Sequence, residues 1–158
     1  GAKCTVLQGA TIRGDFGGRI EIGKKTNIQE NCCIHVNHDE VTRIGDKVTI
    51  GHGAIVHGCD VGEGTLIGMG ATVIDRAKIG SHCLVGAGAL VTGTADIPDG
   101  WLAIGSPARA VRPLTEKELA ELESAWKEYC EIGTDMERQG LLLPGSAYSP
   151  LPRSAAFQ

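Results

Sequence analysis

The fold is decided by residues 61–97, which read VGEGTLIGMGATVIDRAKIGSHCLVGAGALVTGTADI. An aliphatic residue recurs here at every sixth position. A period of six fits neither an α-helix nor a simple alternating strand, but it fits a short strand and a tight corner repeated around a prism. Three such sides give a coil of roughly 18 residues. The repeating positions are Val61, Ile67, Val73, Ile79, Val85, Val91 and Ile97.

The same register continues upstream with two longer intervals. Ile12 to Ile22 and Ile34 to Ile44 are each ten residues apart instead of six. About four extra residues are therefore expected to bulge from each of these two corners. Taking every third repeat gives three columns, one for each side of the prism: Ile22, Ile44, Val61, Ile79 and Ile97; Ile28, Ile50, Ile67 and Val85; and Ile12, Ile34, Val56, Val73 and Val91.

The composition agrees with stacked coils and excludes some partners. Glycine makes up 23 of 158 residues and only six residues are aromatic, as expected where corners demand unusual φ angles and one aliphatic per side points inward. The net charge is −4 and the longest basic run is Lys24-Lys25, so neither a nucleic-acid nor a membrane partner is predicted. Six cysteines without CxxC spacing indicate a reducing compartment, and we expect a cytoplasmic protein. The sequence begins without Met, which leaves open that a targeting peptide precedes it.

Three segments are predicted. Residues 1–112 form an all-β solenoid domain, and residues 113–132 contain a helix that packs on the solenoid or on a neighbouring subunit. Thr115 begins this helix, with Glu118 three residues later as in a capping box. Residues 133–158 contain three prolines without periodicity and are expected to be an irregular tail. The helix face is predicted to consist of Leu119, Leu122, Trp126 and Tyr129 or Cys130.

Two histidines occupy the same corner position on successive coils. His35 follows the inward Ile34 and His57 follows the inward Val56, so their backbones should lie about 4.8 Å apart. Two nitrogens on one tetrahedral zinc lie roughly 3.3 Å apart, a gap that side-chain tilts can close. His52 belongs to another column, so it can complete the site only from a second subunit, in a threefold ring with three sites. The alternative is that these are surface histidines without a joint role.

Several motifs together carry a family resemblance. The most specific is GHGAIVHGC at residues 51–59, with His35 upstream. Over residues 5–132 the chain resembles the gamma-class carbonic anhydrases, which are hexapeptide-repeat proteins. The resemblance implies a left-handed parallel β-helix with triangular coils followed by a C-terminal α-helix, assembled as a homotrimer. The further matching motifs are RGD at 13–15, NIQ at 27–29, IGM at 67–69 and GSPA at 105–108.

The resemblance also implies an enzyme and a metal. His35 and His57 of one subunit and His52 of the next would bind zinc, with iron or cobalt as alternatives. A zinc-bound hydroxide would then hydrate carbon dioxide reversibly to bicarbonate. No covalent intermediate is required.

Further site residues follow by the same comparison. Gln29 matches the position that helps orient the metal-bound solvent, Asn27 flanks it, and Tyr129 matches an active-site tyrosine. Without the resemblance, Asn27 and Gln29 would be interpreted as polar surface residues and Tyr129 as a packing residue. Arg13 lies one coil before His35 with Asp15 beginning the adjoining loop. This pair is expected to form an ion pair at the trimer interface, or else an ordinary surface pair.

Two departures concern proton transfer and leave other functions open. Phe16 stands where active members of the family have a glutamate, and the long acidic loop that supplies a proton-shuttling glutamate is missing after His35. The nearby substitutes are His38, as a possible proton shuttle, and its neighbours Asp39 and Glu40. One alternative function is a hexapeptide-repeat acyltransferase, which uses a single histidine as base. Another is a non-catalytic member that keeps the fold and the metal.

Overall fold

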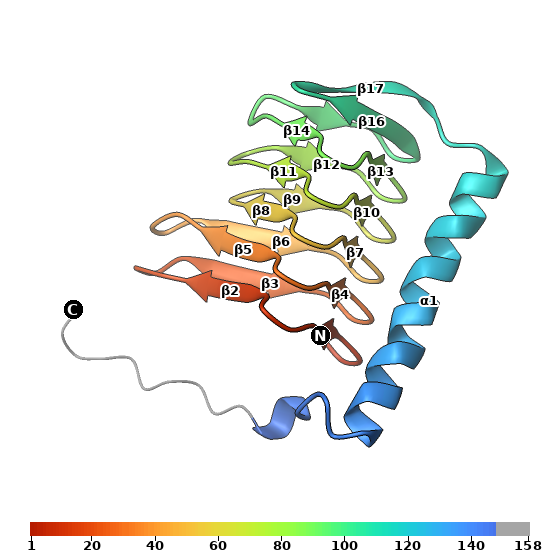
Figure 1. Ribbon diagram of the computed structural model, residues 1–158. Helices are drawn as coiled ribbons and strands as arrows, with labels where there is room; N and C mark the ends of the chain where they lie inside the picture. Colours follow the sequence, from red (N-terminus) through yellow and green to blue (C-terminus); the bar gives the residue numbers. More distant parts are fainter. Residues whose placement is uncertain (148–158) are drawn as a thin grey trace.

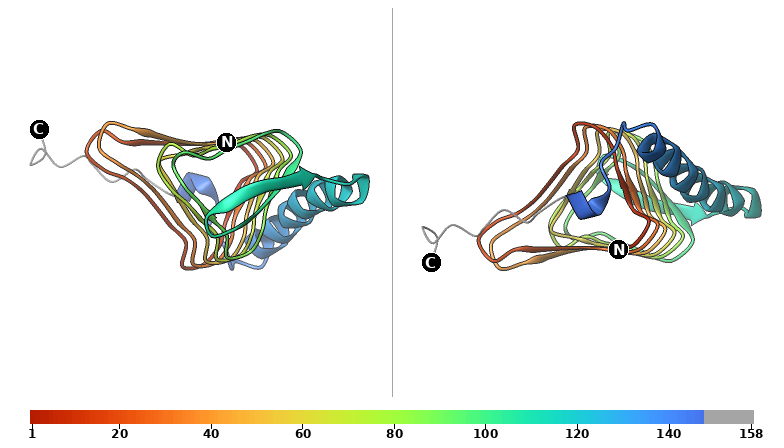
Figure 2. Two further views of the ribbon diagram at one scale, coloured as in Figure 1. Left: turned by 90° about the horizontal axis from the view of Figure 1, so that it is seen from above. Right: turned by 90° about the horizontal axis from the view of Figure 1, so that it is seen from below.

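The computed structural model describes residues 1–147 as a triangular solenoid with a helix along its side (Figure 1). Three sheets make the three sides of the prism (Figure 2). Sheet A contains β1 (Thr5–Val6), β4 (Asn27–Ile28), β7 (Thr49–Ile50), β10 (Leu66–Ile67), β13 (Leu84–Val85), β16 (Trp101–Gly105) and β17 (Ala108–Pro113). Sheet B contains β2 (Thr11–Gly14), β5 (Cys33–Val36), β8 (Ile55–His57), β11 (Thr72–Val73) and β14 (Leu90–Val91). Sheet C contains β3 (Arg19–Ile22), β6 (Val41–Ile44), β9 (Asp60–Val61), β12 (Lys78–Ile79) and β15 (Asp96–Ile97).

The predicted columns are the inward rows of these sheets. Ile28, Ile50, Ile67 and Val85 are in register along sheet A, and the other two columns lie along sheets B and C in the same way. All pairings are parallel except the one between β16 and β17. In Figure 1 the chain runs left along the front in β2, returns behind in β3 and climbs from coil to coil, which is a left-handed winding. The fold class predicted from the six-residue period is confirmed.

The two ten-residue intervals project from the prism at their corners, as predicted, but they do so as paired strands rather than as loops. They lengthen β2, β3, β5 and β6 to four residues each. Both insertions fall on successive coils, so the extra residues of one coil pair with those of the next and satisfy their backbone hydrogen bonds. The result is a corner between sheets B and C that projects from the prism in the lower two coils (Figure 2).

Glycine serves two purposes in the coils, of which only one was predicted. Gly70 at a corner has φ +66°, as expected, although Lys25 and Lys47 also take left-handed φ values of 56° and 55° at their corners. Gly68, which directly follows the inward Ile67, needs glycine for a different reason. A Cβ there would lie 2.5 Å from the backbone nitrogen of Ala87 on the next coil. Close stacking of backbones therefore explains part of the glycine excess.

Helix α1 (Glu116–Arg138) begins as predicted, ends later and buries the predicted face except for Leu119. The Thr115 side chain accepts a hydrogen bond from the Glu118 N–H, and both partners of the capping box are formed. The buried residues are Leu122, Trp126 and Gly133, whereas Leu119 is 38% exposed. Gly133 does not end the helix: a Cβ there would collide with the Thr5 side chain of β1, so glycine permits close docking. The predicted tail thus begins with helix, followed by a short 3₁₀ turn η1 (Gly145–Ala147), and residues 148–158 lie outside the described residues.

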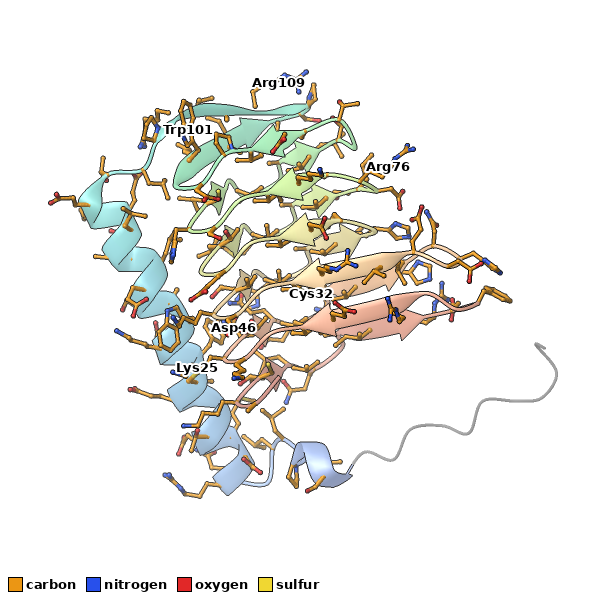
Figure 3. The ribbon with its side chains drawn as sticks, turned by 180° about the vertical axis from the view of Figure 1, so that it is seen from behind. Lys25, Cys32, Asp46, Arg76, Trp101 and Arg109 are labelled. Carbon is orange, nitrogen blue, oxygen red and sulfur yellow. The ribbon has the colours of Figure 1, made fainter. Side chains whose placement is uncertain are left out.

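The helix packs on the solenoid of its own chain. Trp126 is 7% exposed, and the ammonium groups of Lys25 and Lys47, from corners of the solenoid, lie 5.0 and 5.8 Å from its ring centre. Lys25 is labelled beside the helix in Figure 3. The Trp126 indole N–H donates to the Glu123 carboxylate at 2.9 Å. Among the described residues, no helix is both long enough and apolar enough to cross a bilayer.

The outer surfaces of sheets B and C differ in charge. Along sheet C, successive strands present charges of alternating sign: Glu21, Arg43, Asp60, Lys78 and Asp96. Arg43 lies 3.5 Å from the Glu21 carboxylate and 3.4 Å from that of Asp60. The corresponding row on sheet B is uncharged and consists of Thr11, Cys33, Ile55, Thr72 and Leu90. Sheet C is therefore suited to water, and sheet B to a contact with protein.

The start of α1 gives the first testable prediction, a pH-dependent contribution from Glu118. Two hydrogen bonds from Arg112, at 2.7 and 2.8 Å, together with those from Thr115, lower the Glu118 pKa to about 2. Because this folded-state pKa lies below the unfolded value of about 4.3, ionised Glu118 stabilises the protein above pH 4.3 and loses that effect as the pH falls towards 2. Glu118→Gln should therefore lower the melting temperature at pH 6, with a difference that shrinks between pH 4.5 and 2. A difference that is constant over this range would contradict the prediction.

Candidate metal centre

The two histidines predicted to stack lie side by side. His35 on β5 and His57 at the end of β8 are partners in the parallel pairing of sheet B. The Nδ1 atom of His35 lies 2.9 Å from the Nε2 atom of His57, and the ring centres are 4.9 Å apart. Two nitrogen ligands of a tetrahedral metal are roughly 3.3 Å apart, so a small ring tilt would let both nitrogens contact one ion. The pair therefore fits a metal that prefers imidazole ligands.

His57 is oriented by a carboxylate that sequence reasoning missed. The His57 Nδ1 atom lies 2.7 Å from Asp75 Oδ1, which also accepts a hydrogen bond from the Asn37 side-chain amide at 2.8 Å. A carboxylate facing Nδ1 places the proton on that nitrogen and leaves the Nε2 lone pair directed at His35. This is the usual arrangement of a metal-binding histidine.

Arg13 and Asp15 form an ion pair against the outer edge of the His35 ring. Arg13 Nε lies 2.9 Å from Asp15 Oδ2, while His35 Nε2 lies 3.0 Å from an Arg13 amino nitrogen and 3.2 Å from Asp15 Oδ2. The expected ion pair is thus present within one chain. The Arg13 side chain is still 62% exposed.

His52 lies on another corner, as the column register predicted. It follows β7, and its Nδ1 atom is 2.6 Å from Glu30 Oε2. As in His57, a carboxylate faces Nδ1 and leaves Nε2 free to bind a metal. Within residues 1–147, no group of three or more His, Cys, Asp or Glu side chains is arranged so that it could hold a metal ion. His52 thus stays apart from the His35–His57 pair within one chain.

Comparisons with known proteins identify the family of this chain. Residues 58–93 match the family model for the bacterial transferase hexapeptide (six repeats). The chain is 42% identical over 137 residues to the probable carbonic anhydrase of Methanocaldococcus jannaschii, covering 87% of this chain and 86% of that protein. It is 40% identical over 138 residues to the mitochondrial gamma carbonic anhydrase 1 of Arabidopsis thaliana, covering 84% of this chain and 50% of that protein. The chain belongs to the gamma carbonic anhydrase family.

The relatives of this family member also include proteins with other names. A hexapeptide transferase family protein from Anaplasma phagocytophilum has a solved structure with a TM-score of 0.79 and 35% identity, covering 89% of this chain and 79% of that chain. The present chain spans about half the length of the Arabidopsis relative. Family membership thus agrees with the fold, while the metal site and the reaction of this gamma carbonic anhydrase family member need their own argument.

The residues expected near the metal-bound solvent lie in a buried polar chain. Asn27 is 2% and Gln29 is 4% exposed, so neither is a surface residue. The Gln29 carbonyl oxygen accepts from the His52 backbone N–H at 3.1 Å, and its amide donates to Asn27 at 3.2 Å. Asn27 in turn donates to the Thr49 hydroxyl at 2.9 Å. The two amides thus hold the backbone of His52.

Tyr129 lies on α1 and is half-buried. Burial, and to a lesser degree the negative charge of Glu30, raises the pKa of the Tyr129 phenol. The backbone carbonyl of Tyr129 accepts from the Thr5 hydroxyl at 3.4 Å. These observations show that Tyr129 packs against the solenoid, and its role in the active site stays a prediction.

His38 occupies the projecting corner beyond β5. Its side chain is 68% exposed, its Nδ1 atom lies 2.5 Å from Asp39, and its ring stacks on Phe16 with centres 5.7 Å apart. Phe16, where active family members have glutamate, thus supports the histidine considered as a shuttle. The structure leaves the His38 ring open to solvent, as a group that exchanges protons with buffer must be.

Proposed function

We propose that this protein is a metal-dependent carbonic anhydrase that hydrates carbon dioxide reversibly to bicarbonate at three sites between the subunits of a homotrimer. The observation that carries the proposal is the split donor set. His35 and His57 face each other at 2.9 Å, and His52 lies on another corner with Glu30 at its Nδ1. Zinc is the expected ion, with iron or cobalt as alternatives, because neutral imidazoles bind all three.

The surface chemistry supports the trimer. His52 lies at the corner where sheet A passes into sheet B, and the His35–His57 pair lies at the far end of sheet B. The uncharged outer row of sheet B suits a contact that joins this end of one subunit to the His52 corner of the next. Such a head-to-tail contact closes into a ring when the rotation is threefold.

In this proposal the residues of the chain bind the metal, orient its histidine ligands and keep solvent from His35. A bound divalent metal supplies a water molecule acidic enough to lose its proton near neutral pH and to add to carbon dioxide. Asp75 and Glu30 hold His57 and His52 so that each presents Nε2. Gln29 and Asn27 fix the backbone that carries His52. Arg13 and Asp15 keep the other edge of His35 from solvent.

Proton export is assigned to His38, with Asp39 and Glu40 beside it. Each hydration releases a proton that must reach the buffer, and a positioned imidazole accelerates such transfers. His38→Ala should therefore lower kcat by about tenfold or more in weakly buffered solution at pH 7.5, and added imidazole should restore it. Stopped-flow hydration assays at low and high imidazole would measure this. Equal rates for both proteins at low buffer would contradict the assignment.

Metal analysis with a stopped-flow hydration assay tests the proposed function. The unchanged protein should hold about one metal per chain and hydrate carbon dioxide, and His35→Ala should lose both. A hexapeptide acyltransferase is the second candidate, favoured by the similarity to the Anaplasma protein. In that case acyl transfer from acetyl-CoA should survive His35→Ala. Full metal content without hydration between pH 6 and 9 would instead indicate a non-catalytic metal-binding member.

A further inference from the structure

The corner after β11 carries Asp75, one coil beyond His57. We propose that Asp75 is a positioning residue that fixes the tautomer and ring orientation of His57, and that Asn37 and Gly58 complete the seat of its carboxylate. The proposal rests on the proposed function in taking His57 as a metal ligand. Arg76, the next residue, marks this corner in Figure 3, on the side of the prism away from α1.

One carboxylate oxygen joins side chains from three successive coils. Asp75 Oδ1 accepts from His57 Nδ1 at 2.7 Å and from the Asn37 amide at 2.8 Å. Asn37 follows β5, His57 ends β8 and Asp75 follows β11. The side chains of His57 and Asp75 are only 23% and 34% exposed, so water competes weakly for these bonds. The carboxylate is thus held from one side by Asn37 while it holds the imidazole on the other.

Gly58 provides the space that the carboxylate occupies. A Cβ at Gly58 would collide with Asp75 Oδ1, and the glycine has φ +55°. Its N–H donates to the Thr42 hydroxyl at 2.9 Å, which donates to the His35 carbonyl oxygen at 2.8 Å. The space that Asp75 needs and the left-handed φ explain the glycine after His57 in GHGAIVHGC, and its N–H also links this corner to the backbone of His35.

The chemistry of the carboxylate decides which nitrogen of His57 carries the proton. An ionised carboxylate only accepts hydrogen bonds, so Nδ1 must be the donor and Nε2 must carry the lone pair. Nε2 is the atom that lies 2.9 Å from His35. Without Asp75 the His57 ring could take either tautomer or rotate about its χ angles. Fewer molecules would then present lone pairs on both His57 Nε2 and His35 Nδ1 to one ion.

The first readout is the tautomer of His57 in the metal-free protein, by ¹⁵N chemical shifts of the imidazole at pH 8. The unchanged protein should show a single Nδ1–H tautomer. Asp75→Ala should give a mixture, and Asp75→Asn, which keeps the volume and a neutral acceptor, an intermediate result. Asp60→Ala is the matched control, because it also removes an aspartate from the solenoid, but Asp60 lies on sheet C and contacts Arg43 rather than a histidine. A His57 tautomer unchanged in Asp75→Ala would overturn the proposal.

The second readout is the affinity for cobalt(II), measured by competition with a chelator in trimer-sized fractions. Asp75→Ala should weaken binding by about 10–100-fold, Asp75→Asn by less, and Asp60→Ala by less than twofold. A cobalt affinity of Asp75→Ala within twofold of the unchanged protein would also overturn the proposal. If the unchanged protein binds no cobalt while the tautomer shift appears in Asp75→Ala, the proposed function fails and the positioning of His57 by Asp75 stands.

Discussion

Chains lacking His52, mixed with an equal amount of chains lacking His57, should regain about a quarter of the metal sites on co-refolding, although neither variant alone binds metal. Each proposed site takes His35 and His57 from one subunit and His52 from the next. In a randomly assembled trimer, the first subunit must be the His52→Ala chain and the second the His57→Ala chain. Each condition holds in about half of the cases, which gives the quarter.

A second mixture provides the control. His35→Ala and His57→Ala chains lack ligands from the same half of the site, so mixing them should restore nothing. Metal content per chain, measured in the trimer fraction after co-refolding, distinguishes the two mixtures. Recovery in the control, or full metal content in the His52→Ala protein alone, would show that the site is not shared between subunits as proposed.

Replacing Gly68 by alanine should destabilise the solenoid much more than replacing Gly70. A Cβ at Gly68 would meet three backbone atoms of the next coil at 2.5 to 2.7 Å, and backbone cannot turn aside as a flexible side chain can. We expect a loss of about 3 kcal/mol or more in the free energy of unfolding. At Gly70, with φ +66° and no described atom within 4 Å of a Cβ, the loss should be about 1 kcal/mol, from the left-handed conformation alone.

The comparison of Gly68→Ala and Gly70→Ala separates two explanations for the glycine content. Chemical denaturation of both variants at one temperature would measure the difference, provided that each transition has a single step. If corner φ angles were the main constraint, Gly70→Ala would cost as much as Gly68→Ala or more. That result would contradict the account of closely stacked backbones.

The columns of the solenoid were predictable because each coil places one aliphatic side chain inward on each side. The six-residue period of the sequence therefore corresponds directly to one side of the prism. The longer corner was predictable too, but its strand pairing was not, because the spacing gives the number of extra residues without showing whether they pair. Arg19 shows that they do, since its N–H donates to the Glu40 carbonyl oxygen at 2.9 Å. The continuation of the helix through Gly133 was not predictable for a similar reason. Its closeness to Thr5 depends on where the helix docks, and no local pattern records that.

The candidate site was predictable where it follows the register and not where it depends on corner side chains. Register alone puts His57 over His35 and sends His52 to another corner. It also puts Ile74 over His57, which was a usable signal that the next residue, Asp75, lies nearby. Whether the Asp75 carboxylate turns towards the imidazole depends on the space at Gly58 and on the hydrogen bond from Asn37. Both become visible only in the folded chain. The burial of Asn27 and Gln29 likewise became visible only in the folded chain.

The central claim is that a metal is bound only where two subunits meet. Native mass spectrometry of the protein refolded with zinc tests it directly, because one spectrum gives both the number of chains and the number of ions. We predict a trimer carrying three zinc ions, and a His52→Ala trimer carrying none. Zinc held by a single chain, or three ions retained in the His52→Ala trimer, would contradict the claim.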